Sequence, residues 1–232
     1  MKGINEMENS KEKLMDKLNP HCFRKPGSPL VYVATPKCAS TFYTTLLLDN
    51  GWDRILFSEI DWDTDHVFGF INDPDIRFYK GLAQDVMNVN DFDEEKGKTL
   101  ENNVVQTFAN FKQDVIVFSS HSMPVYIKYG EYCNKIDWIP IVDGVPHHEL
   151  FLKLLKQYNL SVEFGENLDP NIANDYKKNY YTKFKAPDIQ ESDLYKIFIA
   201  GNRDLFNQVR SKINPSGSNW QEISWLEDKN TL

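Results

Sequence analysis

The sequence predicts an α/β fold in which a mostly parallel sheet is flanked by helices. Short apolar runs rich in β-branched and aromatic residues alternate along the chain with segments of helical periodicity. The first of these runs leads through a tight turn directly into a helix. Strands that alternate with helices are typical of a parallel sheet with helices on both faces. In such sheets ligands bind at the carboxyl ends of the strands.

The expected strands are short, and turn residues bound them. Proline cannot donate a hydrogen bond to a neighbouring strand, so Pro140 within the last expected strand suits only a sheet edge or a bulge. The sequence predicts strands at Pro29–Thr35, Ile55–Ile60, His66–Ile71, Asp114–Phe118 and Ile136–Val142.

The expected helices lie between these strands and after the last of them. Asn50-Gly51 ends the first helix, and Pro146 suits the first turn of the fourth because a proline there loses no helical hydrogen bond. The sequence predicts helices at Phe42–Leu48, Asp75–Met87, Leu100–Phe111, Pro146–Tyr158 and Glu191–Lys212.

The polarity of the chain divides it into a body and two ends. Residues 1–28 are polar and are expected to form a loosely attached arm that ends at Pro26-Gly27. Residues 29–214 are expected to form one domain. Residues 215–232 carry Trp220 and Trp225 and are expected to pack back on that domain.

Composition excludes several classes of function. With a net charge of −8 the chain is a poor nucleic-acid binder, because neutralising phosphates needs a basic surface. The chain has three cysteines, a small and odd number that argues against a disulfide framework. The absence of such a framework favours a reducing compartment. No stretch approaches the ~20 apolar residues of a membrane helix, and residues 1–28 hold no apolar signal segment. We therefore expect a cytoplasmic protein without a membrane partner.

The strongest local signal is the turn between the first strand and the first helix. A helix start presents unpaired backbone N–H groups and the positive end of the helix dipole. Lys37 adds a full positive charge, and Ser40 and Thr41 add hydroxyl donors. These features predict an oxyanion-binding turn, although an ordinary strand-to-helix turn is an equal alternative from these residues alone. The turn comprises Pro36, Lys37, Cys38, Ala39, Ser40 and Thr41.

The turn differs from the loop of nucleoside triphosphatases. That loop needs Gly-x-x-x-x-Gly-Lys-Ser/Thr, and here no glycine lies between Gly27 and Gly51. No aspartate stands in a matching place to bind Mg²⁺, and His147-His148 lacks a spaced third metal ligand. We therefore expect an anion site that needs no metal ion.

The turn resembles the 5′-phosphosulfate loop of sulfotransferases that use 3′-phosphoadenosine 5′-phosphosulfate (PAPS), in particular the carbohydrate sulfotransferases. The family's loop reads Pro-Lys-x-x-x-Thr, and further motifs resemble the family in the expected order over roughly residues 29–210. They are Asn72–Lys80, which is similar to Arg-Asp-Pro-x-x-Arg-x-x-Ser, then His121–Pro124, Tyr129–Cys133 with Ile136–Ile139, and Tyr181-Thr182 with Tyr195 and Asp204–Phe206. The resemblance implies the sulfotransferase fold, a P-loop-type α/β fold.

The second motif departs from the family at two positions. Asn72 stands where the family has the arginine that grips the 3′-phosphate, and Lys80 stands where it has a serine. The lysine restores the positive charge that the asparagine removes. We therefore expect Lys80 and Arg77 to hold the 3′-phosphate while Asn72 donates a neutral hydrogen bond.

The resemblance implies transfer of a sulfuryl group from PAPS to an acceptor hydroxyl, with 3′-phosphoadenosine 5′-phosphate (PAP) as product. Lys37 would serve the bridging and 5′-phosphate oxygens as the leaving group departs, as in phosphoryl transfer. A general base must take the acceptor proton. Glu59 and His121 are candidates because each ends an expected strand, and Asp61, Asp63, Asp65 and His66 are close alternatives.

The acceptor would be a glycan or another small molecule, by analogy with enzymes that sulfate sugar hydroxyls. Lysines near Tyr176, Tyr180 and Tyr181 could help to bind the nucleotide, namely Lys177, Lys178, Lys183 and Lys185. Two other functions stay open. One is a P-loop phosphoryl transferase that uses Mg²⁺ and ATP, and the other is a non-enzymatic nucleotide- or partner-binding module.

The charge compensation at Asn72 and Lys80 is testable. We expect Lys80→Ala to lower the affinity for PAP, because the substitution removes the charge that replaces the family's arginine. A binding titration with PAP measures the effect. Unchanged affinity would contradict the compensation.

Overall fold

The computed structural model describes residues 14–19, 21–78, 80–81, 123–141, 146–165 and 193–211. It is a mixed α/β structure around a five-stranded sheet with the strand order β3-β1-β2-β4-β5. The strands are β1 (Cys22–Arg24), β2 (Leu30–Val33), β3 (Asp53–Ile55), β4 (His66–Asn72) and β5 (Asp137–Ile141). The sheet therefore confirms the α/β class.

The sheet is parallel on one side and antiparallel on the other. β2 pairs with β4, and β4 with β5, in parallel, whereas β1 runs antiparallel to both β2 and β3. Among the described strands β5 is an edge strand that pairs with β4 on one side. The opposite side of β5 can accommodate Pro140, because a proline has no N–H to donate to a further strand. The expected strands at 29–35, 66–71 and 136–142 are confirmed, whereas that at 114–118 lies outside the described residues.

Two expectations about elements in the first half of the chain are wrong. Residues 22–24, placed in the loose arm, form β1 in the interior of the sheet, where Cys22 and Phe23 are completely buried. The expected strand at 55–60 is instead β3 followed by the 3₁₀ helix η1 (Phe57–Glu59). Burial recurs there at Phe57 and Ile60, which fits the three-residue period of a 3₁₀ turn.

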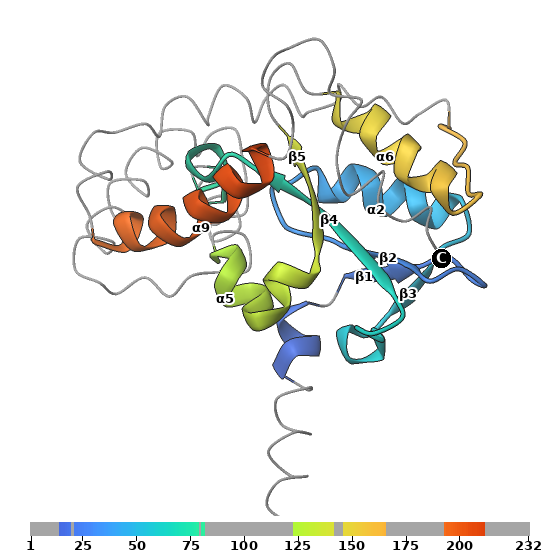
Figure 1. Cartoon of the computed structure of the whole chain (residues 1–232), viewed down its shortest axis with the longest axis horizontal. Coiled ribbons are helices and arrows are strands. Elements are labelled where there is room, and N and C mark those ends of the chain that lie inside the picture. Colours follow the sequence, from blue (N-terminus) through green and yellow to red (C-terminus); the bar gives the residue numbers. More distant parts are fainter. Residues whose placement is uncertain are drawn as a thin grey trace, which may run out of the picture.

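Helices cover both faces of the sheet (Figure 1). One face carries α2 (Ser40–Asp49) and α6 (His147–Gln157), and the other carries α5 (Val125–Tyr129), η3 (Gly130–Lys135) and α9 (Asp193–Ser211). Residues 74–78 and 80–81 are helical as expected. The expected helix at 100–111 and the tail at 215–232 lie outside the described residues. Among the described helices none is both long and apolar enough to cross a membrane.

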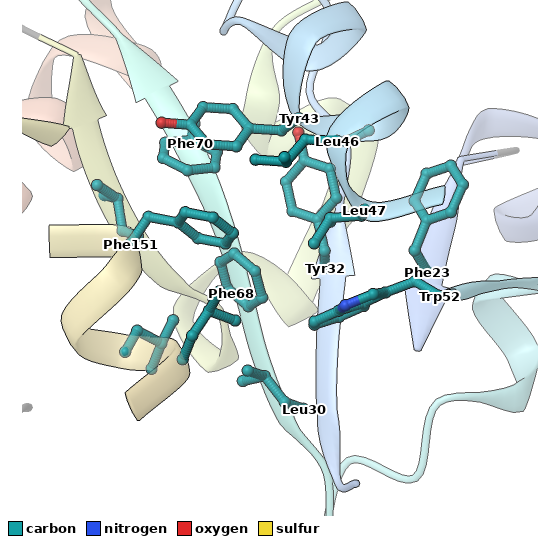
Figure 2. Packing of buried hydrophobic residues seen from close by; sticks show 14 of the residues in the cluster. Phe23, Leu30, Tyr32, Tyr43, Leu46, Leu47, Trp52, Phe68, Phe70 and Phe151 are labelled. Carbon is teal, nitrogen blue, oxygen red and sulfur yellow. The ribbon is translucent and has the colours of Figure 1, made fainter. Parts of the chain in front are cut away.

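The alternation of side chains along the strands builds the two halves of the core. Tyr32 of β2 and Phe68 and Phe70 of β4 pack under α2 and α6, and Figure 2 shows them together with Tyr43, Leu46 and Leu47 of α2. Val31, Val33, Val67 and Ile71 point to the opposite face, toward α5 and α9. Because both faces are buried, β2 and β4 read as continuous apolar runs.

Local sequence explains why α2 begins and ends where it does. Tyr43, Leu46 and Leu47 are its buried residues, at the i, i+3, i+4 spacing of one helical face. Gly51 follows at a φ of 71°, a left-handed conformation that glycine adopts at little cost, and its N–H donates to Leu48 O. The helix stop expected at Asn50-Gly51 is confirmed.

Gly69 in β4 tests how closely the strands and helices pack. A Cβ atom there would lie 2.9 Å from Cζ3 of Trp138 and 3.1 Å from the carbonyl oxygen of Val33. We expect Gly69→Ala to lower the free energy of unfolding by about 1–3 kcal/mol through overpacking. Urea denaturation measures it. The cost should be smaller in a Trp138→Phe background, which removes Cζ3, and an equal cost in both backgrounds would contradict the contact.

Candidate functional site

The turn between β2 and α2 lies at the carboxyl edge of the parallel strands. Residues 36–39 form the turn, and Ala39 is the N-cap of α2. Alanine has no side-chain oxygen, the first turn holds no acidic residue, and among the described residues no side chain caps the helix. The N–H groups at a helix start have no partner within the helix, so the start of α2 favours a bound anion.

The backbone of the turn has an unusual conformation. Lys37 has a φ of 63° and Ala39 a φ of 54°, whereas Cys38 between them lies outside the positive-φ region. Such alternation is typical of backbone concavities that bind anions. In this turn the N–H of Cys38 donates to the carbonyl oxygen of Thr35 at 3.2 Å. A non-glycine residue in the left-handed region costs about 1–2 kcal/mol. Surrounding contacts must therefore hold the turn in this shape.

Two side chains at and just after the carboxyl end of β4 supply those contacts. Asn72 Nδ2 donates to the carbonyl oxygen of Lys37 at 3.2 Å, and Arg77 Nε donates to that of Pro36, also at 3.2 Å. Arg77 Nη2 additionally donates to Met123 O at 2.6 Å. Asn72 is 4% exposed and Arg77 1% exposed. We call Asn72 and Arg77 the carbonyl clamp, because they fix two consecutive carbonyl groups of the turn.

The carbonyl clamp buries the Arg77 side chain that was expected to hold the 3′-phosphate. A guanidinium that is 1% exposed and donates to two backbone carbonyls offers little surface to a nucleotide. Asn72 is likewise committed, since its Oδ1 also accepts from the N–H of Asp73 at 2.9 Å. The roles expected for both at the 3′-phosphate stay predictions, and the observed role of each is to support the turn.

Cys38 and Lys80 lie beside the clamp. The Cys38 thiol is fully buried, and burial raises its pKa although Arg77 and Lys80 oppose the shift, so the side chain is a thiol at neutral pH. Burial lowers the pKa of Lys80, which is partly exposed. Lys80 is thus the cation of the second motif that retains access to solvent near the turn.

Polar residues that sequence reasoning missed complete the carboxyl edge. Thr35 Oγ1 and the Tyr129 hydroxyl lie 2.9 Å apart in a buried hydrogen bond between the end of β2 and α5. Asp73 Oδ1 accepts from the N–H groups of Asp75 and Ile76 at 2.9 and 3.3 Å, as an N-cap does. An aspartate before Pro74 is a local capping signal that the sequence could have supplied, whereas the Thr35–Tyr129 pair is 94 residues apart.

Glu59 does not join the turn, and the expectation that it faces the same edge is wrong. Its carboxylate accepts from the N–H of Leu56 at 2.5 Å, within η1. Arg24 Nη2 donates both to Glu59 O at 3.0 Å and to the carboxylate of Asp65, which immediately precedes β4. Glu59 therefore lies near the amino end of β4, whereas the turn is bonded to Asn72 at its carboxyl end.

The alternatives near Glu59 share its position. Asp61, Asp63 and Asp65 form the turn that leads into β4, where Asp61 Oδ1 accepts from Asp63 N and Asp65 Oδ2 from Asp61 N. His66 begins β4 and lies between Asp137, at 2.5 Å from Nε2, and the Tyr158 hydroxyl at Nδ1. His121 and the lysines at 177, 178, 183 and 185 lie outside the described residues.

Comparison with protein-family models, with curated protein sequences and with solved structures gives no match in any of the three.

The carbonyl clamp makes a stability prediction. We expect Arg77→Met to lower the free energy of unfolding by about 1–3 kcal/mol for each carbonyl left without its donor. Arg203→Met is the matched control, since Arg203 pairs with Asp75 at the surface, with the side chains 49% and 36% exposed. That pair should contribute about 0–1 kcal/mol. Urea denaturation measures the free energy of unfolding of both variants. Equal losses of stability in the two variants would contradict the clamp.

Proposed function

We propose that the chain is a PAPS-dependent sulfotransferase with the sulfotransferase variant of the α/β fold. One observation carries the proposal: a clamped turn, with Lys37 in it, precedes a helix whose N-cap is an alanine, at the carboxyl edge of the parallel strands. This is the geometry that oxyanions bind. The order of sequence motifs that resemble the family supports phosphosulfate as the oxyanion.

The turn would bind and orient the 5′-phosphosulfate. Its N–H groups and the hydroxyl groups of Ser40 and Thr41 would hold the non-bridging oxygens. Lys37 would neutralise the charge that grows on the bridging oxygen as the sulfuryl group leaves. Preorganised donors of this kind need no reorganisation during the reaction, because the fold has already fixed them.

Lys80 would take the 3′-phosphate. It is partly exposed beside the turn, and a buried arginine already occupies the neighbouring space. Bound phosphate would offset the desolvation that lowers the pKa of Lys80, so nucleotide and protonated lysine should stabilise each other. Residues 36–41 and Lys80 would thus bind the two phosphate ends of PAPS.

The finer parts of the proposal come from the sequence. The carbohydrate hydroxyl as acceptor follows from the family resemblance, the cytoplasmic location from the few cysteines, and the chemistry without a metal ion from the residues of the turn. The two rival functions are separable by ligand. A phosphoryl transferase requires ATP with Mg²⁺, and a partner-binding module requires neither nucleotide.

The test compares nucleotides by thermal shift of the purified protein. PAP at 100 times its Kd should add about 2.7 kcal/mol to the stability of the folded state, whereas ATP–Mg²⁺ should add less. Stabilisation by ATP–Mg²⁺ alone would favour the phosphoryl transferase. The absence of stabilisation by either nucleotide would favour the module.

Lys37→Ala then tests the chemistry. We expect PAP release from PAPS, measured with pooled oligosaccharide acceptors, to fall on the order of 10²–10³-fold, because one preorganised donor is lost. Lys156→Ala is the control, because this exposed lysine lies in the last turn of α6, at the end remote from the turn. A Lys37→Ala variant with wild-type turnover would remove Lys37 from the mechanism.

A further inference from the structure

A tyrosine–histidine pair lies next to the clamped turn. The hydroxyl of Tyr43, in α2, and Nδ1 of His148, in α6, are hydrogen-bonded at 2.9 Å. His148 is the second residue of α6, and Tyr43 is four residues after the N-cap of α2. The His148 ring also lies 5.3 Å from the ring of Phe42, in the first turn of α2. The imidazole therefore sits beside the helix start that we propose to bind the phosphosulfate.

The topology explains why these two helix starts meet. β2 leads into α2, and β5 precedes α6 in the chain, while both strands run parallel to β4. Helices that follow parallel strands on one face of a sheet begin at the same edge. Glu59 and the aspartates before β4 lie at the other edge, whereas the imidazoles of His148 and of its neighbour His147 lie near the turn. We single out His148 because its Nδ1 is hydrogen-bonded to the Tyr43 hydroxyl.

Tyr43 holds the imidazole rigidly. Its ring stacks on Phe70, with centroids 3.7 Å apart and planes inclined by 13°, and meets Phe151 edge-on at 5.1 Å. Figure 2 shows Tyr43 extending from α2 over the sheet onto Phe70. Tyr43 is completely buried, and burial raises its pKa, so it remains a neutral phenol. A fixed hydroxyl thus orients the His148 ring, as the third member of a catalytic triad orients a base.

The surroundings of His148 keep it neutral. Burial lowers its pKa, and the positive end of the α6 dipole acts in the same direction. The titratable groups that face it are Tyr43 from α2 and His147 from its own helix, with ring centroids 5.6 and 4.3 Å away, and Glu149 follows it in sequence. Phe42 supplies an apolar contact. A neutral, half-buried imidazole can accept a proton at neutral pH.

We propose that His148 is the general base of the transfer and that Tyr43 is its positioning residue, an inference that rests on the proposed function. His148 Nε2 would accept the proton of the acceptor hydroxyl while the acceptor oxygen forms a bond to the sulfur of PAPS. The bond from sulfur to the bridging oxygen breaks, and PAP leaves with that electron pair. The products are the sulfate ester, PAP and protonated His148, which returns its proton to water.

The experiment uses the full chain with PAPS and two acceptor probes, a methyl glucoside and p-nitrophenol. A sugar hydroxyl needs a base, whereas p-nitrophenol is readily ionised near neutral pH and needs much less help. We expect His148→Gln to lower PAP release with the glucoside on the order of 10²–10⁴-fold and with p-nitrophenol only a few-fold. Tyr43→Phe should cause a smaller loss and move the acidic limb of the pH–rate profile.

The controls separate this inference from the proposed function. His21→Gln removes an exposed imidazole that bonds Arg54, and it should leave both rates unchanged. PAP must stabilise the wild type and both His148→Gln and Tyr43→Phe, which shows that the nucleotide site and the fold are intact. With PAP binding retained, equal rates for His148→Gln and wild type, or equal losses with both probes, would overturn the base assignment alone.

Two further outcomes would count against the proposed function as well as the base assignment. A wild-type protein that PAP does not stabilise would overturn the proposed function and, with it, the base. A wild-type protein that binds PAP but turns over PAPS with neither probe would overturn the base and the catalytic part of the proposed function, and would leave only the nucleotide site.

Discussion

The turn after β2 depends on the carbonyl clamp, which Asn72 at the end of β4 and Arg77 just after it provide. Asn72 and Arg77 donate to consecutive carbonyl groups, those of Lys37 and Pro36, and thereby fix the peptide planes on either side of Lys37, which has a positive φ. The shape of the turn thus depends on buried donors near the carboxyl end of β4, which hold an unfavourable backbone between β2 and α2.

The buried arginine also links the turn to the opposite layer of the molecule. Its second bond reaches the carbonyl of Met123, just before α5, while the Thr35–Tyr129 pair joins the same two regions. Burying a guanidinium is costly unless its donors are hydrogen-bonded. The buried Arg77 side chain therefore favours the arrangement in which the carbonyl groups of Pro36 and Met123 both lie next to it. Packing on both faces of the sheet then determines the geometry of the turn.

The two edges of the parallel strands have different chemistry. The carboxyl edge gathers the starts of α2 and α6, whose dipoles and N–H groups favour an anion and a neutral imidazole. The amino edge gathers Arg24 with Asp65 and His66 with Asp137, which satisfy one another. Groups that bond each other in this way tie the ends of the strands together.

The sequence by itself determined the local units. The strand–turn–helix around Lys37, the stop at Asn50-Gly51 and the strands β4 and β5 follow from hydrophobic runs and turn residues, which act between near neighbours in the chain. Tertiary structure alone decided that residues 22–24 are an interior strand, that Glu59 lies at the far edge, that Arg77 supports the turn and that Tyr43 meets His148. Pairings across 41 and 105 residues, as for Arg77–Pro36 and Tyr43–His148, leave no periodic trace in the sequence, because they depend on which strands pair and which face each helix covers.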